Sequence, residues 1–295
     1  MSVTIYDRDL GSRLFDALNI IFMIFVVIVT LYPLYHIGIV SLSDGNAVLR
    51  GDVRFFPVGF TLDSYKLVLQ DPAILQSLLN SVIYTTVGTF INLSFTALCA
   101  YPLSRASFSG RKFFTWMVTA TMFFSGGLIP LYLLVLRLGL MNTMWALVLP
   151  GAISPWYMFI MRTYFQGIPE AIIESAIIDG ANELQILLKI VLPLSKPILA
   201  TLLLFYAVGH WNSFFDALIF LDEKRKYPLQ LIMRSVVILG RFEQTGEIDA
   251  ATDFMVIEQT LKYATIMVST LPILLVYPFV QQYFVKGVTV GAIKG

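Results

Sequence analysis

The stretch IPEAIIESAIIDGANELQILLKIVLPLSKPIL, residues 168–199, is the most informative part of the sequence. Pro169 suits the first turn of a helix, and Glu170 beside it is favourable at the positive N-terminal end of a helix dipole. A helix that runs from there to Asp179 would stop at Gly180, since glycine is the typical residue just after a helix end. The first half of the stretch therefore predicts one short helix that ends in a glycine turn.

A second short helix is expected directly after that turn. Asn182 can cap it, with Gln185 three residues later as in a capping box, and Pro193 is expected to end it. Each of the two helices has an apolar face that is too short to cross a bilayer. Such a face meets either the membrane surface or a partner protein, and the periodicity alone leaves both possibilities open.

The rest of the chain has the composition of a membrane protein. Of its 295 residues, 57% are apolar and 13% are charged, whereas about 25% are charged in an ordinary soluble domain. A membrane span needs roughly 20 mostly apolar residues, and six segments qualify: about 17–40, 78–103, 114–136, 143–164, 198–221 and 263–284. We therefore predict an all-α, polytopic membrane protein with six transmembrane helices in a single domain, residues 1–295.

Glycine and proline interrupt two of these spans. Ser125-Gly126-Gly127 and Pro130 break the third span, and Pro150 and Pro155 break the fourth. Broken helices survive in a bilayer where neighbouring helices or water satisfy the freed backbone groups. We therefore expect these two spans to face other helices or a cavity.

Charge gives a weak indication of orientation. Six spans place both termini on one side, but Lys plus Arg then divides evenly between the two sides. Short loops carry more weight: the 104–113 loop has three cations and no acid, whereas the 41–77 loop has three cations against four Asp. This favours cytoplasmic termini and a cytoplasmic 168–197 loop. The net charge of +1 gives no reason to expect nucleic-acid binding.

Signatures of catalysis are absent from the sequence. No G-x-x-x-x-G-K-[ST] phosphate loop occurs, so the chain cannot cradle ATP by that mechanism. The lone Cys99 excludes an internal disulfide and a cysteine-based metal site. His36 and His210 do not have the spacing of metal ligands. We therefore predict no enzyme activity, no cofactor and no metal in this chain.

The 168–197 loop resembles the EAA loop of ABC-importer permeases. It has Glu174-Ser175-Ala176, two residues, Asp179-Gly180, nine residues and then Ile190-x-Leu192-Pro193, with Ser175 in place of the family's first Ala. Both of those residues are small. In that family this loop is the coupling helix, which sits in a cleft of the ATPase subunit. The resemblance implies these ATPase-coupling residues: Glu174, Ser175, Ala176, Asp179, Gly180 and Ala181.

Nearly the whole chain shares a resemblance to carbohydrate-uptake permeases of the second-subunit type related to the maltose importer, and within them to the complex-oligosaccharide branch. The strings that carry it are 102–114, 121–134, 138–151, 205–218 and 283–295. It implies a permease subunit of an ATP-driven sugar or oligosaccharide importer in the bacterial cytoplasmic (inner) membrane. The implied partners are a second homologous permease, two cytoplasmic ATPase subunits that carry ATP–Mg, an extracytoplasmic solute-binding protein and membrane lipid.

Two other functions stay open. An ABC permease for a peptide or polyamine agrees with the EAA loop, although the flanking strings argue against it. An ion-coupled secondary transporter would need no coupling helix and would usually place more ionisable residues at mid-membrane. An intramembrane enzyme would need paired catalytic residues, and none are visible.

Polar and aromatic residues within the spans are candidates for a substrate path, because polar groups are costly there. His210, Trp211 and Asn212 lie in the fifth span, and Trp156 follows Pro155 in the fourth. Trp211 can stack on a sugar ring, and we predict that it lines the path. Asn212 can bond sugar hydroxyls or join two helices, and we favour the second role.

Overall fold

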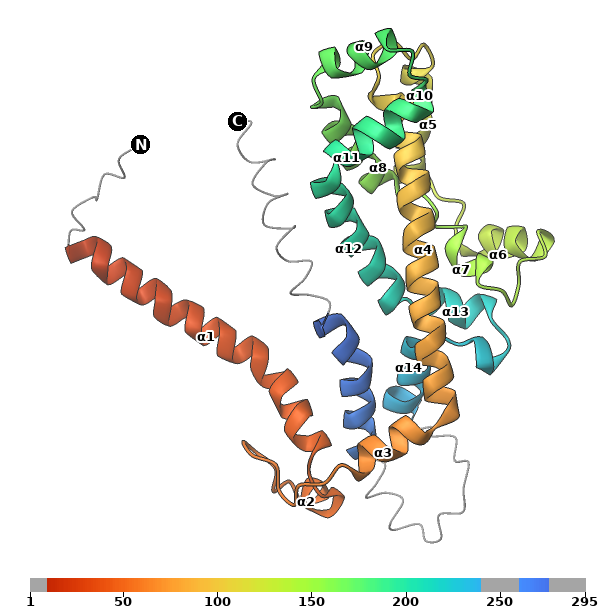
Figure 1. The fold of residues 1–295 in the computed structure, drawn as a ribbon. Helices are drawn as coiled ribbons and strands as arrows, with labels where there is room; N and C mark the ends of the chain where they lie inside the picture. Colours follow the sequence, from red (N-terminus) through yellow and green to blue (C-terminus); the bar gives the residue numbers. More distant parts are fainter. Residues whose placement is uncertain (1–9, 240–259, 276–295) are drawn as a thin grey trace. The chain divides into compact units, whose positions relative to one another are not determined.

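The computed structural model describes residues 10–239 and 260–275 of the chain, and every regular element in this part is a helix (Figure 1). The chain divides into two compact units. Unit 1 comprises Met1–Gln70 and Phe242–Val268, and unit 2 comprises Asp71–Arg241 and Ser269–Gly295. This all-helical architecture agrees with the predicted fold class. The single domain over residues 1–295 stays a prediction, because two compact units can belong to one membrane domain.

Unit 1 is dominated by the long helix α1, Leu10–Ser41, which covers the first predicted span. In its most apolar stretch no residue is buried within the chain, so lipid or another protein must cover it. The short helices α2, Gly45–Leu49, and α3, Asp63–Gln70, follow. Asp44 caps α2 by accepting hydrogen bonds from the backbone N–H groups of Asn46 and Ala47.

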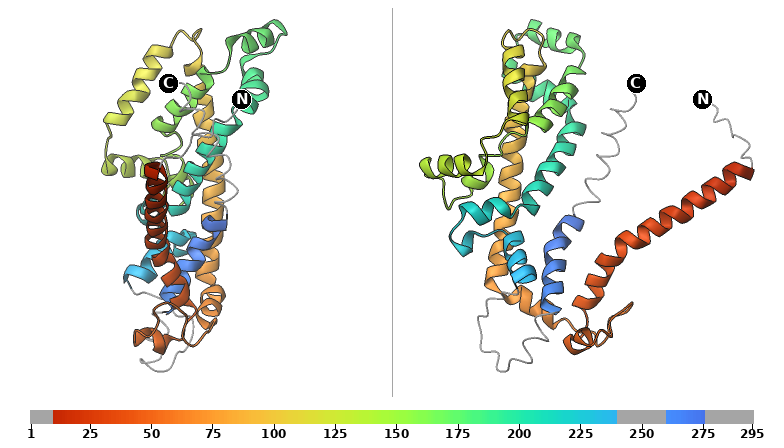
Figure 2. Two further views of the ribbon diagram at one scale, coloured as in Figure 1. Left: turned by 90° about the vertical axis from the view of Figure 1, so that its left-hand side faces the viewer. Right: turned by 180° about the vertical axis from the view of Figure 1, so that it is seen from behind.

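Unit 2 is built on α4, Pro72–Ser104, which contains the second predicted span and begins at the N-cap Asp71. Helices α12, Lys196–Asn212, and α8, Pro155–Gln166, pack along it (Figure 2). The α8 side chains of Met158, Met161 and Phe165 are buried there. The expectation that the fourth span faces other helices is therefore confirmed for its second half.

The third span is sharply bent. Helices α5, Arg111–Phe123, and α6, Leu128–Arg137, meet at an angle of 116° across the predicted glycine break. Helix α5 contacts α4 and α8 as expected, and Val118 packs against their core, but no residue of α5 is fully buried. Gly127 stands at the N-cap of α6 with φ +83°, a backbone conformation that favours glycine.

The fourth and fifth spans are also interrupted. The one-turn helix α7, Trp145–Val148, precedes α8, and α12 is followed by α13, Phe215–Phe220. Two described helices, Gly11–Ser41 and Pro72–Ser104, are long and apolar enough to cross a membrane, and two bent pairs raise that number to four. The described residues thus support a membrane protein, while the count of six spans stays a prediction.

A cluster of hydrogen-bonded polar side chains follows α13. There the 3-10 helix Lys224–Lys226 leads to α14, Leu229–Leu239. Asn142, with φ 60°, donates to Glu223 at 2.6 Å, and Lys226 donates to Glu223 at 2.9 Å. Hydrogen bonds from Lys226 and Arg225 lower the pKa of Glu223 to about 2. Beyond this segment, the helix Thr260–Leu275 covers the first half of the sixth predicted span, and residues 276–284 lie outside the described part.

The 168–197 loop folds as predicted up to its end. Helix α9 is Glu170–Ile178 and α10 is Glu183–Ile186, followed by the π-helix Leu187–Val191 and the short α11, Leu192–Leu194. The prediction that Pro193 ends the second helix is wrong by two residues. The π-turn carries the helix through the proline, and the chain bends by 84° only between Leu194 and Lys196.

Candidate functional site

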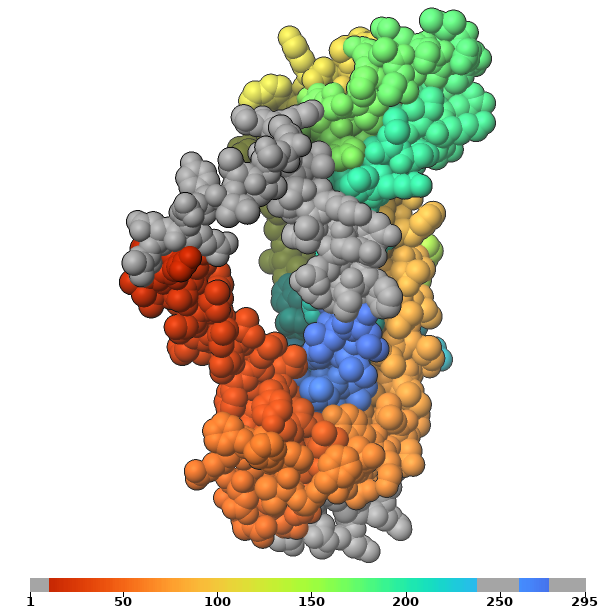
Figure 3. Space-filling view, turned by 60° about the vertical axis from the view of Figure 1, so that its left-hand side comes forward, coloured from red at the N-terminus to blue at the C-terminus, as the bar shows by residue number. Residues whose placement is uncertain are grey.

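The candidate site is the helical cap, which we define as α9, α10 and the turn between them. It lies at one end of unit 2, beside the C-terminal end of α4 (Figure 3). Gly180 has φ +81°; its N–H donates to Ile177 O at 3.0 Å, and the Ala181 N–H donates to Ala176 O at 2.9 Å. This pair of bonds is a Schellman motif, which glycine allows because it has no β-carbon. The predicted glycine turn is confirmed.

The start of α10 is fixed by a reciprocal capping box. Gln185 N donates to the Asn182 side chain at 2.9 Å, and the Gln185 side chain accepts from Asn182 N at 3.0 Å. The two bonds satisfy donors that a helix start leaves free. The turn between the helices is thus held on both sides by local hydrogen bonds, as the sequence predicted.

The inner face of the cap is apolar and buried. Ile173 and Ala176 from α9 and Ile186 from α10 are at most 7% exposed and belong to the same core as Tyr101 of α4. This core continues into α8 and α12. The cap is therefore packed on the helix bundle of unit 2 and does not hang free as a loop.

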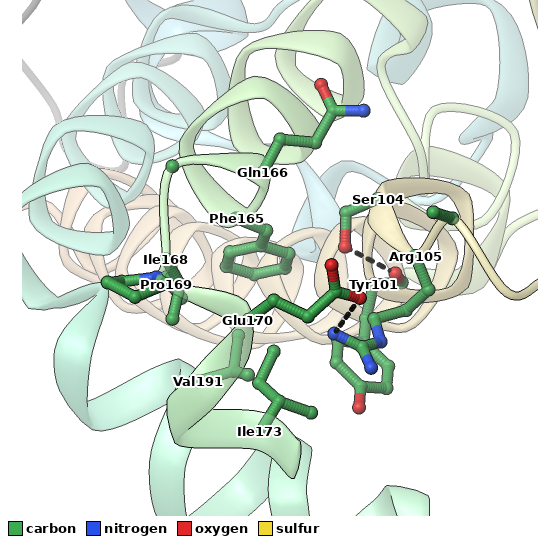
Figure 4. A pocket seen from close by; sticks show the side chains of 12 residues that line it. Tyr101, Ser104, Arg105, Phe165, Gln166, Ile168, Pro169, Glu170, Ile173 and Val191 are labelled. Carbon is green, nitrogen blue, oxygen red and sulfur yellow. Dashed lines mark hydrogen bonds and ion pairs between the residues drawn. The ribbon is translucent and has the colours of Figure 1, made fainter.

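Two polar contacts tie the cap to the end of α4. Tyr101 donates a hydrogen bond to Glu183, the first residue of α10, at 2.5 Å. Arg105 lies 4.0 Å from Glu170, the first residue of α9. The Glu170 carboxylate points toward the Arg105 guanidinium across a pocket of about 470 Å³ (Figure 4). One helix end thus positions the first turns of both cap helices.

The outer face of the cap combines apolar and acidic side chains. Ile178 is 84% exposed, Leu184 57% and Ile177 48%, and Glu174 and Asp179 are exposed near them. Large apolar side chains gathered on a folded surface are typical of a contact with a partner. The cap therefore presents apolar and acidic side chains together on one exposed surface.

The six predicted coupling residues divide between the two faces. Glu174, Ser175, Asp179 and Gly180 are exposed, Ala181 is half-buried and Ala176 is buried. The Ser175 hydroxyl donates a hydrogen bond to the Ile172 carbonyl of its own helix at 2.9 Å. The small residue types fit these places: Ala176 packs inward, and Ser175 leaves room on the surface for a close approach.

The predicted path residue His210 lies between α12 and α4. Its Nε2 donates to Asn92 Oδ1 at 2.5 Å, and Asn92 Nδ2 donates to the carbonyls of Gly151 at 2.7 Å and Ala152 at 3.0 Å. A β-carbon on Gly88 of α4 would come within 2.5 Å of the His210 ring. We call Gly88, Asn92 and His210 the α4–α12 junction, in which Asn92 uses both its amide oxygen and its amide nitrogen within the chain.

Trp211 is also turned inward. Trp211 is only 8% exposed, and its indole N–H donates to the Ser269 carbonyl at 3.2 Å. The packing role is thus well supported. Contact of Trp211 with a transported solute stays a prediction.

Asn212 and Trp156 are the outward-facing members of the predicted path set. Asn212 is exposed, and its amide donates to the Val208 carbonyl of its own helix at 3.0 Å. Its role in joining two helices stays a prediction. Trp156 is 62% exposed in the first turn of α8, which Ser154 caps.

Sequence reasoning missed three residues that build these sites. Tyr101 and Arg105 hold the cap, and Asn92 holds the junction. Asn92 is a buried polar residue within a span, a signal that could have marked it. No group of three or more His, Cys, Asp or Glu side chains suited to a metal ion occurs within residues 10–239 and 260–275.

Known proteins resemble this chain over nearly its full length. The family model described as "Binding-protein-dependent transport system inner membrane component" matches residues 8–290. Protein LplC of Bacillus subtilis is 44% identical over 97% of this chain and 96% of its own length. The polygalacturonan/rhamnogalacturonan transport system permease protein YtcP of the same organism is 40% identical over 96% of this chain and 99% of its own length.

A solved structure matches the fold closely. It is that of a bacterial ABC transporter involved in the import of the acidic polysaccharide alginate. The TM-score is 0.86 and the identity 32%, and the match covers 94% of this chain and 98% of the other.

Proposed function

Because the chain belongs to the family of binding-protein-dependent transport system inner membrane components, we propose that it is the permease subunit of an ATP-driven importer for a sugar or oligosaccharide. Members of this family are transporter permeases and not themselves enzymes. The energy for uptake then comes from other subunits. The apolar helices α1 and α4 of the described chain agree with an inner-membrane location.

The complete importer, in this proposal, contains four kinds of component. Besides this chain there are a second homologous permease, two cytoplasmic ATPase subunits that bind ATP–Mg, and an extracytoplasmic solute-binding protein. The family description itself names dependence on a binding protein. The exposed apolar surface of α1 supports a membrane or second-permease environment, since none of its most apolar stretch is buried within the chain.

The observation that carries the proposal is the cap. Its inner face is anchored by Tyr101 and Arg105, and its outer face presents Ile177, Ile178 and Glu174. A preformed surface of apolar and acidic side chains suits docking into a cleft, because few backbone groups have to become ordered on binding. We assign this outer face to the ATPase subunit.

The substrate class follows from the relatives. One relative is named for polygalacturonan and rhamnogalacturonan, and the solved structure belongs to an importer of alginate, an acidic polysaccharide. We therefore propose a complex oligosaccharide as the solute, with uronic-acid oligosaccharides as the first to be tested. Along the path, Trp156 and Asn212 are the residues whose exposed side chains are free to meet it.

The orientation proposal has the cap and both termini in the cytoplasm. The test uses a cysteine at Ile178, the most exposed apolar residue of the cap, in a Cys99→Ala background without the ATPase subunits. An impermeant thiol reagent should label this cysteine in inverted vesicles and not in intact cells. Efficient labelling from outside intact cells would contradict the orientation and the docking role.

Transport itself is tested by reconstitution. The chain is co-expressed with the second permease, ATPase and solute-binding protein encoded beside it, and the complex is placed in proteoliposomes. We expect ATP-dependent uptake of a labelled oligogalacturonide or a neutral oligosaccharide, and no uptake when the ATPase subunits are omitted. Uptake that instead follows an ion gradient without ATPase subunits would refute the proposal.

A further inference from the structure

The end of unit 2 that carries the cap also carries cations that are not paired with any acid of the described residues. Arg111 and Lys112 begin α5, and Arg162 lies near the C-terminal end of α8, which packs against α5. Within the described residues none of these three makes an ion pair, whereas Arg105 reaches Glu170. Because α5 packs against α8, Arg111 and Arg162 bring like charges to the same end of unit 2, and neither has an ion-pair partner among the described residues.

Arg162 has unused hydrogen-bonding capacity. Its Nε is buried and has no partner among the described residues, and its guanidinium lies 5.8 Å from the centre of the Phe159 ring. A guanidinium carries five donors in a planar fork that matches the oxygens of a phosphate. Because like charges repel, an anion from outside the chain would stabilise the Arg111–Arg162 arrangement.

The turn that presents these cations is held in place by aromatic packing. The Phe114 ring stacks on Phe108 at 5.9 Å and meets Phe113 edge-on at 5.3 Å. A β-carbon on Gly110 would come within 2.9 Å of the Phe114 ring and 3.1 Å of the Phe108 ring. The positions of Arg111 and Lys112 at the start of α5 are therefore fixed by packing and do not depend on a flexible loop.

The surface next to the cations is apolar and aromatic. Helix α5 buries none of its residues, and Phe113 is 69% exposed and Trp116 72%. Aromatic side chains in this position are typical of the boundary between bilayer and water. The cations therefore lie at the end of a lipid-facing helix, whereas the face assigned to the ATPase is formed by α9 and α10.

We propose that Arg111, Lys112 and Arg162 form a binding site for the phosphate of an anionic phospholipid headgroup, with the acyl chains lying along Phe113 and Trp116. Basic pockets between helices at the cytoplasmic side of a membrane are suited to such headgroups. Arg162 supplies the forked donors from α8, and Arg111 and Lys112 close the site from α5. The bound lipid adds a further link between α5 and α8, so it stabilises the bent third span. This site is separate from the proposed import function, and its failure would leave that function untouched.

The test measures lipid retention by the assembled importer. Wild type and the variant Arg162→Gln are reconstituted in nanodiscs of phosphatidylcholine mixed with phosphatidylglycerol, extracted in detergent, and examined by native mass spectrometry. We expect Arg162→Gln to retain phosphatidylglycerol roughly fivefold more weakly, the factor expected for one basic residue at an anionic surface. Arg162→Lys should recover part of the retention. The matched control is Arg137→Gln, which removes an exposed cation at the end of α6 and should change nothing.

Each alternative has its own outcome. If inorganic phosphate displaces the retained lipid, the site takes a free anion and the lipid proposal is overturned. If Arg162→Gln keeps its phosphatidylglycerol but loses ATPase subunits, the cations serve the protein partner instead. Should Arg162→Gln fail to assemble, Arg111→Gln gives the same test from the start of α5, and equal lipid retention in that variant would refute the site.

Discussion

The helical cap and the α4–α12 junction use their polar residues in opposite ways. In the cap, Tyr101 and Arg105 of α4 contact the first residues of α10 and α9, whereas Glu174 and Asp179 are exposed on the outer face. In the junction, Asn92 is 1% exposed. Its amide oxygen accepts a hydrogen bond from His210, and its amide nitrogen donates to two carbonyls of the non-helical segment before α8. The cap is therefore built to offer a surface, whereas the junction is built to hold three segments together.

Helix α12 connects these two regions. It begins at Lys196, after the π-helix and α11 that follow the cap, and carries His210 near its other end. A movement imposed on the cap by a partner would reach the junction through the π-helix, α11, the 84° bend and then α12. Substitutions in the junction should reduce stability, whereas substitutions on the outer face of the cap should reduce coupling without unfolding the protein.

The largest effect is expected at Asn92. Asn92→Leu removes the hydrogen-bond partner of His210 and the donor to the carbonyls of Gly151 and Ala152, and a buried polar group left unsatisfied costs about 1–3 kcal/mol. We expect a large fall in the yield of folded protein and in the thermal unfolding temperature in detergent. Asn212→Leu is the control, because Asn212 is exposed and bonds only its own helix. Equal unfolding temperatures for the two variants would remove the distinction between the regions.

A smaller loss of stability is expected at Gly88. The β-carbon of Gly88→Ala would meet the His210 ring at 2.5 Å, and overpacking of this kind costs about 1–3 kcal/mol. Gly209→Ala on α12 is the matched control, since nothing lies within 4 Å of its added β-carbon. Adding His210→Ala to Gly88→Ala should relieve the clash and recover part of the unfolding temperature. If the double variant is no more stable than Gly88→Ala, the clash is not the cause.

The anchor beneath the cap should matter less for the whole protein and more for α10. Tyr101→Phe removes the hydrogen bond to Glu183, and a bond to a charged group contributes about 1.5 kcal/mol at the lower end of its range. Hydrogen exchange should become faster in the amides of α10, with little change in α4. Tyr164→Phe serves as control, because that ring packs in the same core. Unchanged exchange in Tyr101→Phe would show that packing alone holds the cap.

The smallest effect on stability is expected at Glu174. Its side chain is exposed, so Glu174→Ala should leave the free energy of unfolding within about 0.5 kcal/mol of wild type. Retention of the ATPase subunits during purification should nevertheless fall, since a desolvated charged contact is worth roughly 1.5–3 kcal/mol. Wild-type retention in a salt series would place the ATPase contact elsewhere on the cap.

Local signals made the cap predictable from sequence. Gly180 and the Asn182–Gln185 pair each act within five residues, so their motifs form wherever those residues stand in a helix–turn–helix segment. Pro193 did not end the second helix. It lies in α11, directly after a π-helix whose Leu187 and Val191 are buried in the core, and the local sequence does not show this packing. Apolar length placed the C-terminal ends of α1 and α4 within one residue, but both helices begin several residues before the predicted spans.

The junction was not predictable in the same way. Asn92 and His210 are 118 residues apart, and no local pattern pairs them. Trp211 and Asn212 are neighbours, yet one packs inward and the other points outward, because successive residues of a helix face different directions. The sequence showed that polar groups in this span were costly, but it did not show which of them were already satisfied within the chain.

The central claim is that the cap couples ATP hydrolysis to transport, and Gly180 tests it most directly against Gly139. Both glycines end a helix in the same motif, with φ +81° and +68°, and neither has a neighbour within 4 Å of an added β-carbon. Valine at either position therefore carries a similar backbone cost of about 1–2 kcal/mol. Only Gly180 lies in the cap.

The measurement is ATPase activity of the purified complex, with and without solute-loaded binding protein, together with the amount of ATPase subunit retained. We predict that Gly180→Val abolishes the stimulation or releases the ATPase subunits, whereas Gly139→Val keeps both near wild type. Wild-type stimulation and retention in Gly180→Val would contradict the account and would make the cap a connector at the membrane surface.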